Sequence, residues 1–419
     1  MTIWHVTGGR PLRGRVEVQG AKNAVLPVIA ASLLCPNETE LTRCPALSDV
    51  DAAVDILRTL DCAVERRGDT LRIDTRNIVL RPVPRTLTGR MRSSVIFLGP
   101  ILARFGEARV SVPGGCELGR RPIDLHLAAL RALGAEIREE GDAVCCRAAS
   151  LRGAEIPLRF PSVGATENAM IAACAARGPS VIYNAAREPE IETLQEYLRS
   201  LGAMIYGAGS PVIRVDGFSP RERGGVAVPA DRIAAATWLS CAVCAGGDLE
   251  LVGAEPRRMM PVLCTLETMG VFLKTGRDSI HIRSRGRPES PGAVVTRPYP
   301  GFPTDAAPLL MAAAVRSRGA SVFIENIFEH RSRHAEELRR LGADILLRGP
   351  AALVNGVDNL RPGTVTAPDL RGGAALVAAA LGTEGETLVL DPGHIRRGYD
   401  GLDAVLRSLG ADVWCEETV

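Results

Sequence analysis

The chain is poor in aromatic residues, which make up only 4% of its 419 residues. Few aromatics with abundant Ala and Gly favour helices packed closely on sheets over an aromatic-rich β-sandwich. Charge of one sign is also lacking, because 50 basic residues face 48 acidic ones and leave a net charge of +2. The bulk charge therefore gives no reason to expect a nucleic-acid or membrane partner.

Long hydrophobic runs are missing as well. The apolar stretches are short or Ala-rich and are interrupted by Gly, Pro or Arg, so we expect no membrane-spanning helix. Residues 1–5 (MTIWH) lack the basic region and apolar run of a secretory signal. The 11 cysteines have irregular spacings, unlike a dense secreted disulfide framework. We therefore expect reduced thiols and a cytoplasmic protein.

One cysteine pair, Cys241 and Cys244, has a spacing found in zinc sites. Zinc needs a second pair of ligands, and none follows at the spacing of a zinc finger. The surrounding run is apolar and helix-like, where small buried thiols are common. The sequence therefore predicts no metal site.

A short pattern recurs six times along the chain: LRxLGAxI or a variant of it. Its copies begin at Leu57, Leu130, Leu198, Leu266, Leu338 and Leu406. The steps between them are 73, 68, 68, 72 and 68 residues. Each copy reads as a helix that ends at Gly and turns into a strand, because Gly tolerates the left-handed backbone found after helix ends.

A second, Ala-rich helix followed by a strand repeats in register with the first pattern, as in residues 168–183 and 309–324. The repeating unit is therefore about one helix–strand–helix–strand–strand. Six such units are too many for one core, so we expect them to divide into two α/β (α+β) domains of three repeats each. The first domain would be residues 21–229, and the second residues 1–20 with 230–419. A ligand site is expected in the cleft between them.

Polar residues stand where each Ala-rich helix begins. These helix starts are Lys22-Asn23, Arg92, residues 162–164, Asp231-Arg232, Thr304-Asp305 and residues 369–371. Capping explains Ser162, Thr304 and Asp231, because side-chain oxygens there accept free backbone N–H bonds. It does not explain Lys22, Arg92 or Arg371, because a cation opposes the helix dipole. We therefore expect these helix ends to bind an anion.

A Gly-rich loop with a single cysteine, PGGCELGRR, occupies residues 113–121. Arg120 and Arg121 would favour the thiolate of Cys116, so that it could donate a proton or attack. Without further information, an idle surface cysteine is nearly as good an interpretation. Arg331 and Arg397, in corresponding loops of the fifth and sixth repeats, add positive charge near the expected cleft.

Several motifs together carry a resemblance to a known family. They are residues 20–27 (GAKNAVLP), 91–94 (MRSS), 98–100 (LGP), 113–119, 121–126 (RPIDLH), 161–168 (PSVGATEN), 186–191 (AREPEI), 299–305 (YPGFPTD) and 397–399 (RGY). The chain resembles, nearly end to end, the UDP-N-acetylglucosamine 1-carboxyvinyltransferases. These enzymes transfer enolpyruvate from phosphoenolpyruvate to the 3-hydroxyl of UDP-N-acetylglucosamine in the first committed step of peptidoglycan synthesis.

The resemblance implies a fold and a set of roles. The fold is an inside-out α/β barrel of six βαβαββ repeats, three in each domain. Cys116 would protonate the methylene carbon of phosphoenolpyruvate, Asp305 would take the proton from the sugar hydroxyl, and Lys22 and Arg397 would hold the charged groups. The residues implied to bind substrates are Lys22, Asn23, Arg92, Arg121, Pro122, Ile123, Asp124, Leu125, Ser162, Val163, Gly164, Thr304, Asp305, Ile327, Arg331, Asp369 and Arg371.

The resemblance also implies that the loop cysteine is the target of fosfomycin. It implies no metal, no organic cofactor and no partner beyond the two small-molecule substrates, and we expect a monomer.

The sequence departs from the family pattern mainly in its second half. Ala306-Ala307 follow Asp305 where an amide-rich run is usual, Ser332-Arg333 stand in place of an aromatic residue and Met, and Arg396 replaces a common Asp. Residues 233–237 (IAAAT), which follow Arg232, contain no Glu where one is common.

The departures leave open a paralogue with another acceptor and a silent UDP-sugar-binding sensor. A 5-enolpyruvylshikimate-3-phosphate synthase ranks lower, because such enzymes lack the Pro-Gly-Gly-Cys loop. A cysteine hydrolase would need a positioned histidine, for which His126 is the only close candidate.

Overall fold

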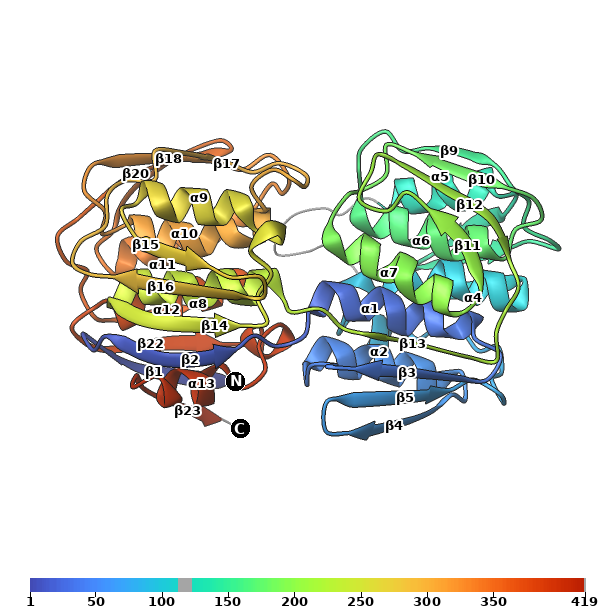
Figure 1. The fold of residues 1–419 in the computed structure, drawn as a ribbon, viewed down its shortest axis with the longest axis horizontal. Coiled ribbons are helices and arrows are strands. Elements are labelled where there is room, and N and C mark those ends of the chain that lie inside the picture. Colours follow the sequence, from blue (N-terminus) through green and yellow to red (C-terminus); the bar gives the residue numbers. More distant parts are fainter. Residues whose placement is uncertain (112–122, 418–419) are drawn as a thin grey trace. The chain divides into compact units, whose positions relative to one another are not determined.

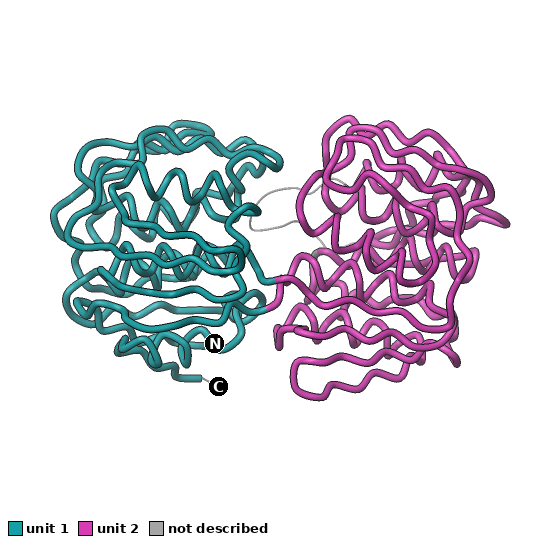
Figure 2. Tube along the Cα trace, viewed as in Figure 1, with its two compact units in different colours: residues 1–19, 116–120, 230–419 teal, residues 20–115, 121–229 magenta. Residues whose placement is uncertain are grey.

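The structure, a computed structural model, describes residues 1–111 and 123–417 (Figure 1). These residues form two compact units, each with a hydrophobic core of its own (Figure 2). Among the described residues, unit 1 holds 1–19 and 230–417, and unit 2 holds 20–111 and 123–229. At the crossings, the Asp231 amide donates to the Gln19 carbonyl (2.8 Å) within unit 1, and the Ala21 amide donates to the Pro229 carbonyl (2.7 Å) within unit 2.

Unit 1 contains three four-stranded sheets. In hydrogen-bonded order their strands are β21 (Thr364–Thr366), β22 (Gly385–Asp391), β1 (Thr2–Gly8) and β23 (Asp412–Glu417); β15 (Phe272–Thr275), β16 (Ser279–Ser284), β14 (Gly247–Val252) and β2 (Leu12–Glu17); and β17 (Ala293–Val295), β18 (Ala320–Ile324), β20 (Ala351–Asn355) and β19 (Asp344–Arg348).

The described residues of unit 2 form two four-stranded sheets and one three-stranded sheet. Their strands are β11 (Ala203–Tyr206), β12 (Val212–Phe218), β10 (Ser180–Tyr183) and β9 (Glu155–Pro157); β13 (Arg223–Ala227), β3 (Glu38–Thr42), β5 (Thr70–Asp74) and β4 (Ala63–Arg67); and β6 (Glu107–Ser111), β8 (Ala143–Arg147) and β7 (Glu136–Glu140).

One pairing pattern recurs in these sheets. In the sheet of β17, the pair β17–β18 is parallel, whereas β18–β20 and β20–β19 are antiparallel. The other four-stranded sheets have the same order of one parallel and two antiparallel pairs. In the sheet of β6, a parallel bridge between Val83 and Val110 takes the place of the parallel strand. The six sequence repeats are therefore six copies of one structural unit.

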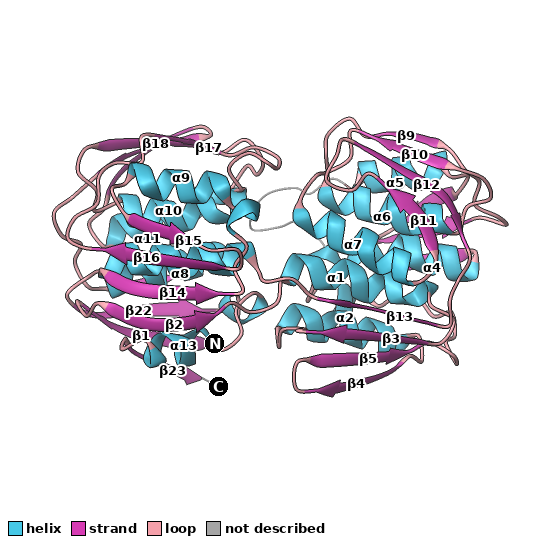
Figure 3. Ribbon diagram, in the orientation of Figure 1, coloured by secondary structure: helices cyan, strands magenta, loops and turns pink. Residues whose placement is uncertain are grey.

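Inside each unit lie the Ala-rich helices, which we call the inner helices; the sheets lie outside them (Figure 3). The inner helices are α8 (Arg232–Ala245), α10 (Ala307–Ala314) and α12 (Leu370–Leu381) in unit 1, and α1 (Lys22–Ala31), α4 (Leu98–Phe105) and α6 (Val163–Cys174) in unit 2. They are mostly apolar, so a stable position requires burial on most sides. In α4 the burial covers Leu98–Leu102, and residues 103–105 are partly exposed. This arrangement is the predicted inside-out barrel.

A second helix in each repeat carries the recurring LRxLGA pattern and buries one face. These helices are α2 (Ser48–Thr59), α5 (Asp124–Ala132), α7 (Pro189–Ser200), α9 (Met260–Thr268), α11 (His334–Arg340) and α13 (Leu402–Ser408). Its two apolar positions, as in Leu57 and Leu60, are 0–2% exposed in all six copies. Burying one such side chain contributes about 1.5–3 kcal/mol, so the pattern holds each repeat to its core.

The residue after each of these helices has the left-handed backbone that the sequence predicted. Gly134, Gly202, Gly270, Gly342 and Gly410 have φ between 75° and 102°. In the first repeat the position is Asp61, whose φ is 61°. Because Asp visits this region more readily than most side chains, the turn is kept without glycine.

The remaining helices of the described residues are short. They are α3 (Arg85–Thr88), η1 (Ser32–Leu34), η2 (Arg92–Phe97), η3 (Pro256–Arg258), η4 (Thr304–Ala306), η5 (Arg331–Arg333) and η6 (Ile395–Arg397).

None of the helices in the described part of the chain has both the length and the apolar character needed to cross a bilayer.

Candidate active site

The polar residues singled out in the sequence lie where the inner helices begin. Lys22 is the first residue of α1, Ser162 is the N-cap of α6, and Asp231 and Asp369 are the N-caps of α8 and α12. The two remaining inner helices are preceded by the short helices η2, which begins at Arg92, and η4, which contains Thr304 and Asp305. The prediction of polar helix starts is therefore confirmed for α1, α6, α8 and α12. For the other two it is shifted, because Arg92 and Thr304-Asp305 begin short 3-10 helices, after which α4 starts at Leu98 and α10 at Ala307.

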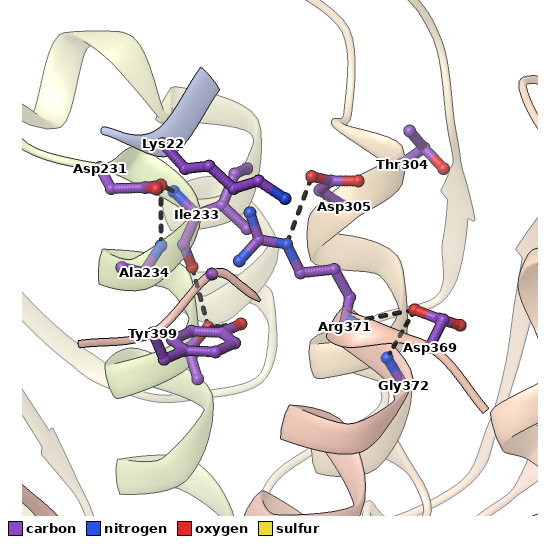
Figure 4. Close-up of polar contacts among 12 residues, drawn as sticks. Lys22, Asp231, Ile233, Ala234, Thr304, Asp305, Asp369, Arg371, Gly372 and Tyr399 are labelled. Carbon is purple, nitrogen blue, oxygen red and sulfur yellow. Dashed lines mark hydrogen bonds and ion pairs between the residues drawn. The ribbon is translucent and has the colours of Figure 1, made fainter. Parts of the chain in front are cut away.

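In unit 1, two of the helix starts are capped by aspartates (Figure 4). An Asp231 side-chain oxygen accepts the amides of Ile233 (2.8 Å) and Ala234 (3.1 Å). An Asp369 oxygen accepts the amides of Arg371 (2.9 Å) and Gly372 (3.0 Å) in the same way. Both caps pair free amides with a negative charge at the positive end of the helix dipole, which stabilises the helix start.

Asp305, the predicted base, is held between two arginines. Its Oδ1 lies 2.7 Å from Arg331 Nη2, and its Oδ2 lies 3.3 Å from Arg371 Nε. Arg331 also pairs with Asp369, the N-cap of α12, with 3.6 Å between Arg331 Nη1 and Asp369 Oδ1. Both arginines are almost fully buried, at 4% and 1% exposure. Two buried guanidinium groups favour the ionised carboxylate, the form in which Asp305 can accept a proton.

Tyr399 lies against the other side of the Arg371 guanidinium, whose central carbon is 5.3 Å from the ring centroid (Figure 4). Burial disfavours the charged form of Arg371, but Tyr399, Asp305 and Asp231 more than offset it and raise its pKa. The Tyr399 hydroxyl is 2.8 Å from Thr237 Oγ1 on α8. Burial raises the pKa of Tyr399, so it stays a neutral phenol at physiological pH.

Glu325, which follows β18, joins the predicted sugar contact Ile327 to the helix start at Thr304. Its Oε2 accepts the Thr304 hydroxyl (2.9 Å), and its Oε1 accepts the amides of Ile327 (2.7 Å) and Phe328 (3.0 Å). Arg331 Nε donates to the Thr304 carbonyl at 3.3 Å. These bonds connect the loop after β18 to the element that carries Asp305.

A small pocket adjoins this network. Its lining includes Ala307, Glu325, Arg331 and Ser332. Ala307 and Ser332 belong to the segments 306–309 and 332–333, in which the sequence departs from the family pattern. These segments therefore line the pocket next to Asp305, whose arginine partners are in place.

In unit 2, the first residue of α1 is paired with an acid that the sequence did not point to. Lys22 Nζ is 2.7 Å from Asp49 Oδ2 in the first turn of α2. The two residues are 8% and 2% exposed. The α1 helix start has no side-chain cap, so Lys22 opposes the dipole, and Asp49 offsets that cost. Asn23, the next residue, is exposed.

The start of α6 rests on a buried histidine. A Cβ on Gly164 would come within 2.9 Å of His126 Cε1, so only glycine permits this close approach. His126 Nδ1 is 2.8 Å from Asn168 Nδ2, and Asn168 Oδ1 accepts the Gly99 amide at 2.9 Å. Burial lowers the pKa of His126 to about 4. A neutral imidazole bonded in this way is a poor general base, which weighs against a cysteine hydrolase.

The remaining predicted binding residues of unit 2 lie at the starts of α5 and α6. Ile123 and Asp124 begin α5, where Asp124 Oδ2 pairs with Arg159 on the surface at 2.7 Å; Leu125 follows and packs against the core. Val163 follows the Ser162 cap in the first turn of α6. Within α6, burial raises the pKa of Glu167 well above its ordinary range, and Glu190 and Glu188 raise it further.

Other predicted residues are described only in part. Cys116, Arg121 and Pro122 lie outside the described residues. For Arg92 only its place at the start of η2 is described, and Arg397 is the half-buried last residue of η6. The structure thus groups Thr304, Asp305, Ile327, Arg331, Asp369 and Arg371 in unit 1. That this group and Lys22 of unit 2 line one cleft stays a prediction.

Sequence reasoning missed Asp49, Glu325 and the position of Tyr399 under Arg371. No local signal marks Asp49, which looks like an ordinary acid in the first turn of a helix. Tyr399 belongs to the Arg-Gly-Tyr motif at residues 397–399, which indicated a segment typical of the family but did not predict the contact with Arg371.

The two cysteines weighed as zinc ligands lie on α8. Burial raises the pKa of Cys241 and raises that of Cys244 to about 12, so both thiols are protonated and poor ligands. Within residues 1–111 and 123–417, no group of three or more His, Cys, Asp or Glu side chains is placed to hold a metal ion.

Comparison with known proteins gives consistent matches. The model of the EPSP synthase (3-phosphoshikimate 1-carboxyvinyltransferase) family matches residues 6–406. The chain is 44% identical over 413 residues to UDP-N-acetylglucosamine 1-carboxyvinyltransferase 2 of Caldanaerobacter subterraneus subsp. tengcongensis, with 99% of both chains covered. It is 45% identical over 414 residues to UDP-N-acetylglucosamine 1-carboxyvinyltransferase 1 of Symbiobacterium thermophilum, with 97% and 94% covered.

Among solved structures, the enolpyruvyl transferase NikO from Streptomyces tendae shares the fold with a TM-score of 0.90 at 24% identity, over 99% of this chain and 98% of that one. Because the relatives and the family model span nearly the whole chain, the chain belongs to the EPSP synthase family of carboxyvinyl transferases and, within it, to the UDP-N-acetylglucosamine 1-carboxyvinyltransferases.

Proposed function

We propose that this protein transfers the enolpyruvyl group of phosphoenolpyruvate to the 3-hydroxyl of UDP-N-acetylglucosamine and releases phosphate. The observation that carries the proposal is the 44% identity, over 99% of both chains, to a relative named for this activity. The reaction would be the first committed step of peptidoglycan synthesis and would take place in the cytoplasm. A cytoplasmic location and a monomeric state stay predictions.

The proposed reaction has an addition step and an elimination step. Cys116 gives a proton to the methylene carbon while Asp305 accepts the proton of the sugar hydroxyl, whose oxygen bonds to the neighbouring carbon. The tetrahedral adduct then loses phosphate and a proton from the new methyl group, which leaves an enol ether. The chemistry requires an acid, a base and a fixed positive field for the phosphate and carboxylate, and needs neither a metal nor an organic cofactor.

The polar helix starts supply candidates for each requirement. Asp305 is a carboxylate held by two buried arginines, so it is ionised and fixed in orientation. Lys22, Asn23, Arg121 and Arg397 would hold the phosphate and carboxylate of phosphoenolpyruvate. The residues that would hold the nucleotide and sugar are Arg92, residues 121–125, residues 162–164, Thr304 and Ile327. Arg331, Asp369 and Arg371 would line the cleft.

The direct test is phosphate release from phosphoenolpyruvate with a panel of acceptors. We expect release with UDP-N-acetylglucosamine and little or none with UDP-glucose, UDP-N-acetylgalactosamine or shikimate 3-phosphate. Release with a different acceptor would identify a paralogue. Tight binding of UDP-N-acetylglucosamine without any release would identify a sensor and contradict the proposal.

The role of Cys116 has its own test. Cys116→Ser should lower turnover near neutral pH by about 100-fold or more, because a serine hydroxyl is a far weaker acid than a thiol beside arginines. Binding of UDP-N-acetylglucosamine, followed by calorimetry, should be kept. The surface variant Cys264→Ser is the control, since Cys264 is exposed on α9. Full activity of Cys116→Ser would contradict the proposal that Cys116 is the acid.

Fosfomycin gives an independent measurement of the same thiol. Mass spectrometry of the intact protein should show one adduct, and peptide mapping should place it at Cys116. An unlabelled Cys116 after treatment with saturating drug would contradict an activated thiol at this position.

A further inference from the structure

Tyr399 connects two inner helices of unit 1 at the point where the proposed base is held (Figure 4). It follows η6 and is 3% exposed. Its hydroxyl lies 2.8 Å from Thr237 Oγ1 in α8, and its ring faces the guanidinium of Arg371 in α12. Arg371 in turn reaches Asp305 in η4, ahead of α10. One contiguous set of contacts therefore links α8, α12 and the element that carries Asp305.

The direction of the hydrogen bonds in this set can be worked out. The Thr237 hydroxyl donates its single hydrogen to the Ile233 carbonyl, at 2.9 Å. It can therefore only accept from Tyr399, so the Tyr399 O–H donates to Thr237. The phenol hydrogen points toward α8, and the lone pairs of the phenol oxygen stay available on the side of the cation. Tyr399 is thus fixed in rotation by α8 and presents only negative surface to Arg371.

The orientation of Arg371 depends on few other contacts. Its Nη1 is buried and has no hydrogen-bond partner among the described residues, while its Nε is the atom that faces Asp305. A guanidinium with an unused donor can rotate toward another acceptor unless packing prevents it. The Tyr399 ring, 5.3 Å below the guanidinium, is the packing contact on that face.

We propose that Tyr399 is a positioning residue for the reaction: by fixing the Arg371 guanidinium, it fixes the carboxylate of Asp305 in the orientation in which it accepts the proton. The proposal rests on the proposed function, because it assigns Asp305 the role of base. Because Tyr399 is buried, it would act through Arg371 and not by contact with a substrate.

The other unit offers a matched control for a buried tyrosine. Tyr197 on α7 is 0% exposed, and its hydroxyl lies 2.7 Å from Thr39 Oγ1 on β3. Removing either phenol oxygen leaves a buried threonine with one bond fewer, which costs about 1 kcal/mol of stability. Tyr399→Phe and Tyr197→Phe should therefore unfold at similar urea concentrations. A merely structural role for Tyr399 predicts equal activities as well.

The experiment measures turnover and UDP-N-acetylglucosamine binding in Tyr399→Phe, Thr237→Val and Tyr197→Phe. We expect kcat for phosphate release to fall at least about ten-fold in the first two, because a small misplacement of a catalytic group has effects of this size. The dissociation constant of the sugar nucleotide should stay within about two-fold of that of the wild type, and Tyr197→Phe should keep its kcat. Equal kcat values in Tyr399→Phe and Tyr197→Phe would overturn the proposal.

A structural measurement separates this inference from the proposed function. If the wild-type protein releases no phosphate with any acceptor, the proposed function fails, and the variants are compared by crystallography alone. Loss of the contact between Arg371 Nε and Asp305 in Tyr399→Phe then supports the positioning role. An unchanged contact in that variant overturns it.

Discussion

In unit 1 the acids Asp231, Asp305 and Asp369 lie at the starts of the inner helices or in the short helix that precedes one of them, whereas unit 2 has Lys22, Arg92 and Ser162 at these places. Asp231 and Asp369 agree with the helix dipole and cap free amides, whereas Asp305 pairs with two arginines. Lys22 opposes the dipole and needs the buried carboxylate of Asp49. The same position of the repeat thus carries an acid in each copy of unit 1 and a cation or a neutral serine in unit 2.

Placement of the partner groups also differs between the units. Unit 1 surrounds its acids with the buried arginines Arg331 and Arg371. Unit 2 has buried acids, Asp49 and Glu167, near its helix starts. An acid held by arginines suits a fixed base, and a cation at a free helix N-terminus suits the binding of an anion. Under the proposed function, unit 1 would therefore supply the base and unit 2 a cation for the anionic substrate.

One feature is the same in both units. His126 in the second repeat and His334 in the fifth occupy equivalent positions, four residues before Leu130 and Leu338. Each packs against a glycine in the first turn of an inner helix, Gly164 in one case and Gly372 in the other. Burial lowers the pKa of both histidines. The middle repeat of each unit therefore keeps a neutral histidine under a helix start.

The largest effect is expected at the acid of unit 1. Asp305→Asn should lower kcat by about 100- to 10,000-fold, because an amide cannot accept the hydroxyl proton. Sugar-nucleotide binding should change far less, since an amide still forms hydrogen bonds. Steady-state phosphate release measures the effect. The control is Asp358→Asn, whose side chain is 87% exposed. A kcat within about two-fold of that of the wild type would exclude Asp305 as the base.

The next largest effect is expected at Asp49, the buried acid that pairs with Lys22 in unit 2. Asp49→Asn should lower the free energy of unfolding by about 3–5 kcal/mol, because it leaves the charge of Lys22 buried at the positive end of α1. Urea denaturation measures the change. Asp55→Asn in the same helix is the control: its partners Arg58 and Arg90 are 57% and 49% exposed, so a loss of about 1 kcal/mol or less is expected for each of these surface pairs. Equal losses in the two variants would show that the buried pair contributes no more than an exposed one.

A smaller effect tests the shared histidines through pH. The pKa of His126 is about 4 in the folded state, against an ordinary value of 6.5, so the unfolded chain binds a proton between these values and the folded chain does not. Stability should therefore be highest above pH 6.5 and fall as the pH drops toward 4. The slope is about 1.4 kcal/mol per pH unit for one such histidine, or about 3 kcal/mol over the window.

The measurement is the urea midpoint of His126→Gln between about pH 4 and 7. This variant and His334→Gln should each show a shallower pH dependence than the wild type, while His330→Gln, at an exposed position, should not. An unchanged slope in His126→Gln would contradict a neutral buried imidazole at this position.

Much of the fold was predictable because it repeats. The LRxLGA pattern fixed six helix ends, and Leu57 and its equivalents are all buried as the pattern requires. The helix starts were predictable because polar residues interrupt long Ala-rich runs. The first repeat shows where the pattern fails to predict the turn. Asp61 keeps the left-handed backbone there, although the glycine that predicts it in the other repeats is missing.

The sequence by itself determined the repeats, the apolar inner helices and the positions of the charged helix starts, because each depends on residues close together along the chain. Only the tertiary structure decided which groups partner these charges. Asp305 and Arg371 are 66 residues apart, and Thr237 and Tyr399 are 162 residues apart. Which distant side chain reaches a buried charge depends on how the repeats pack around one core, and no local pattern encodes that distance.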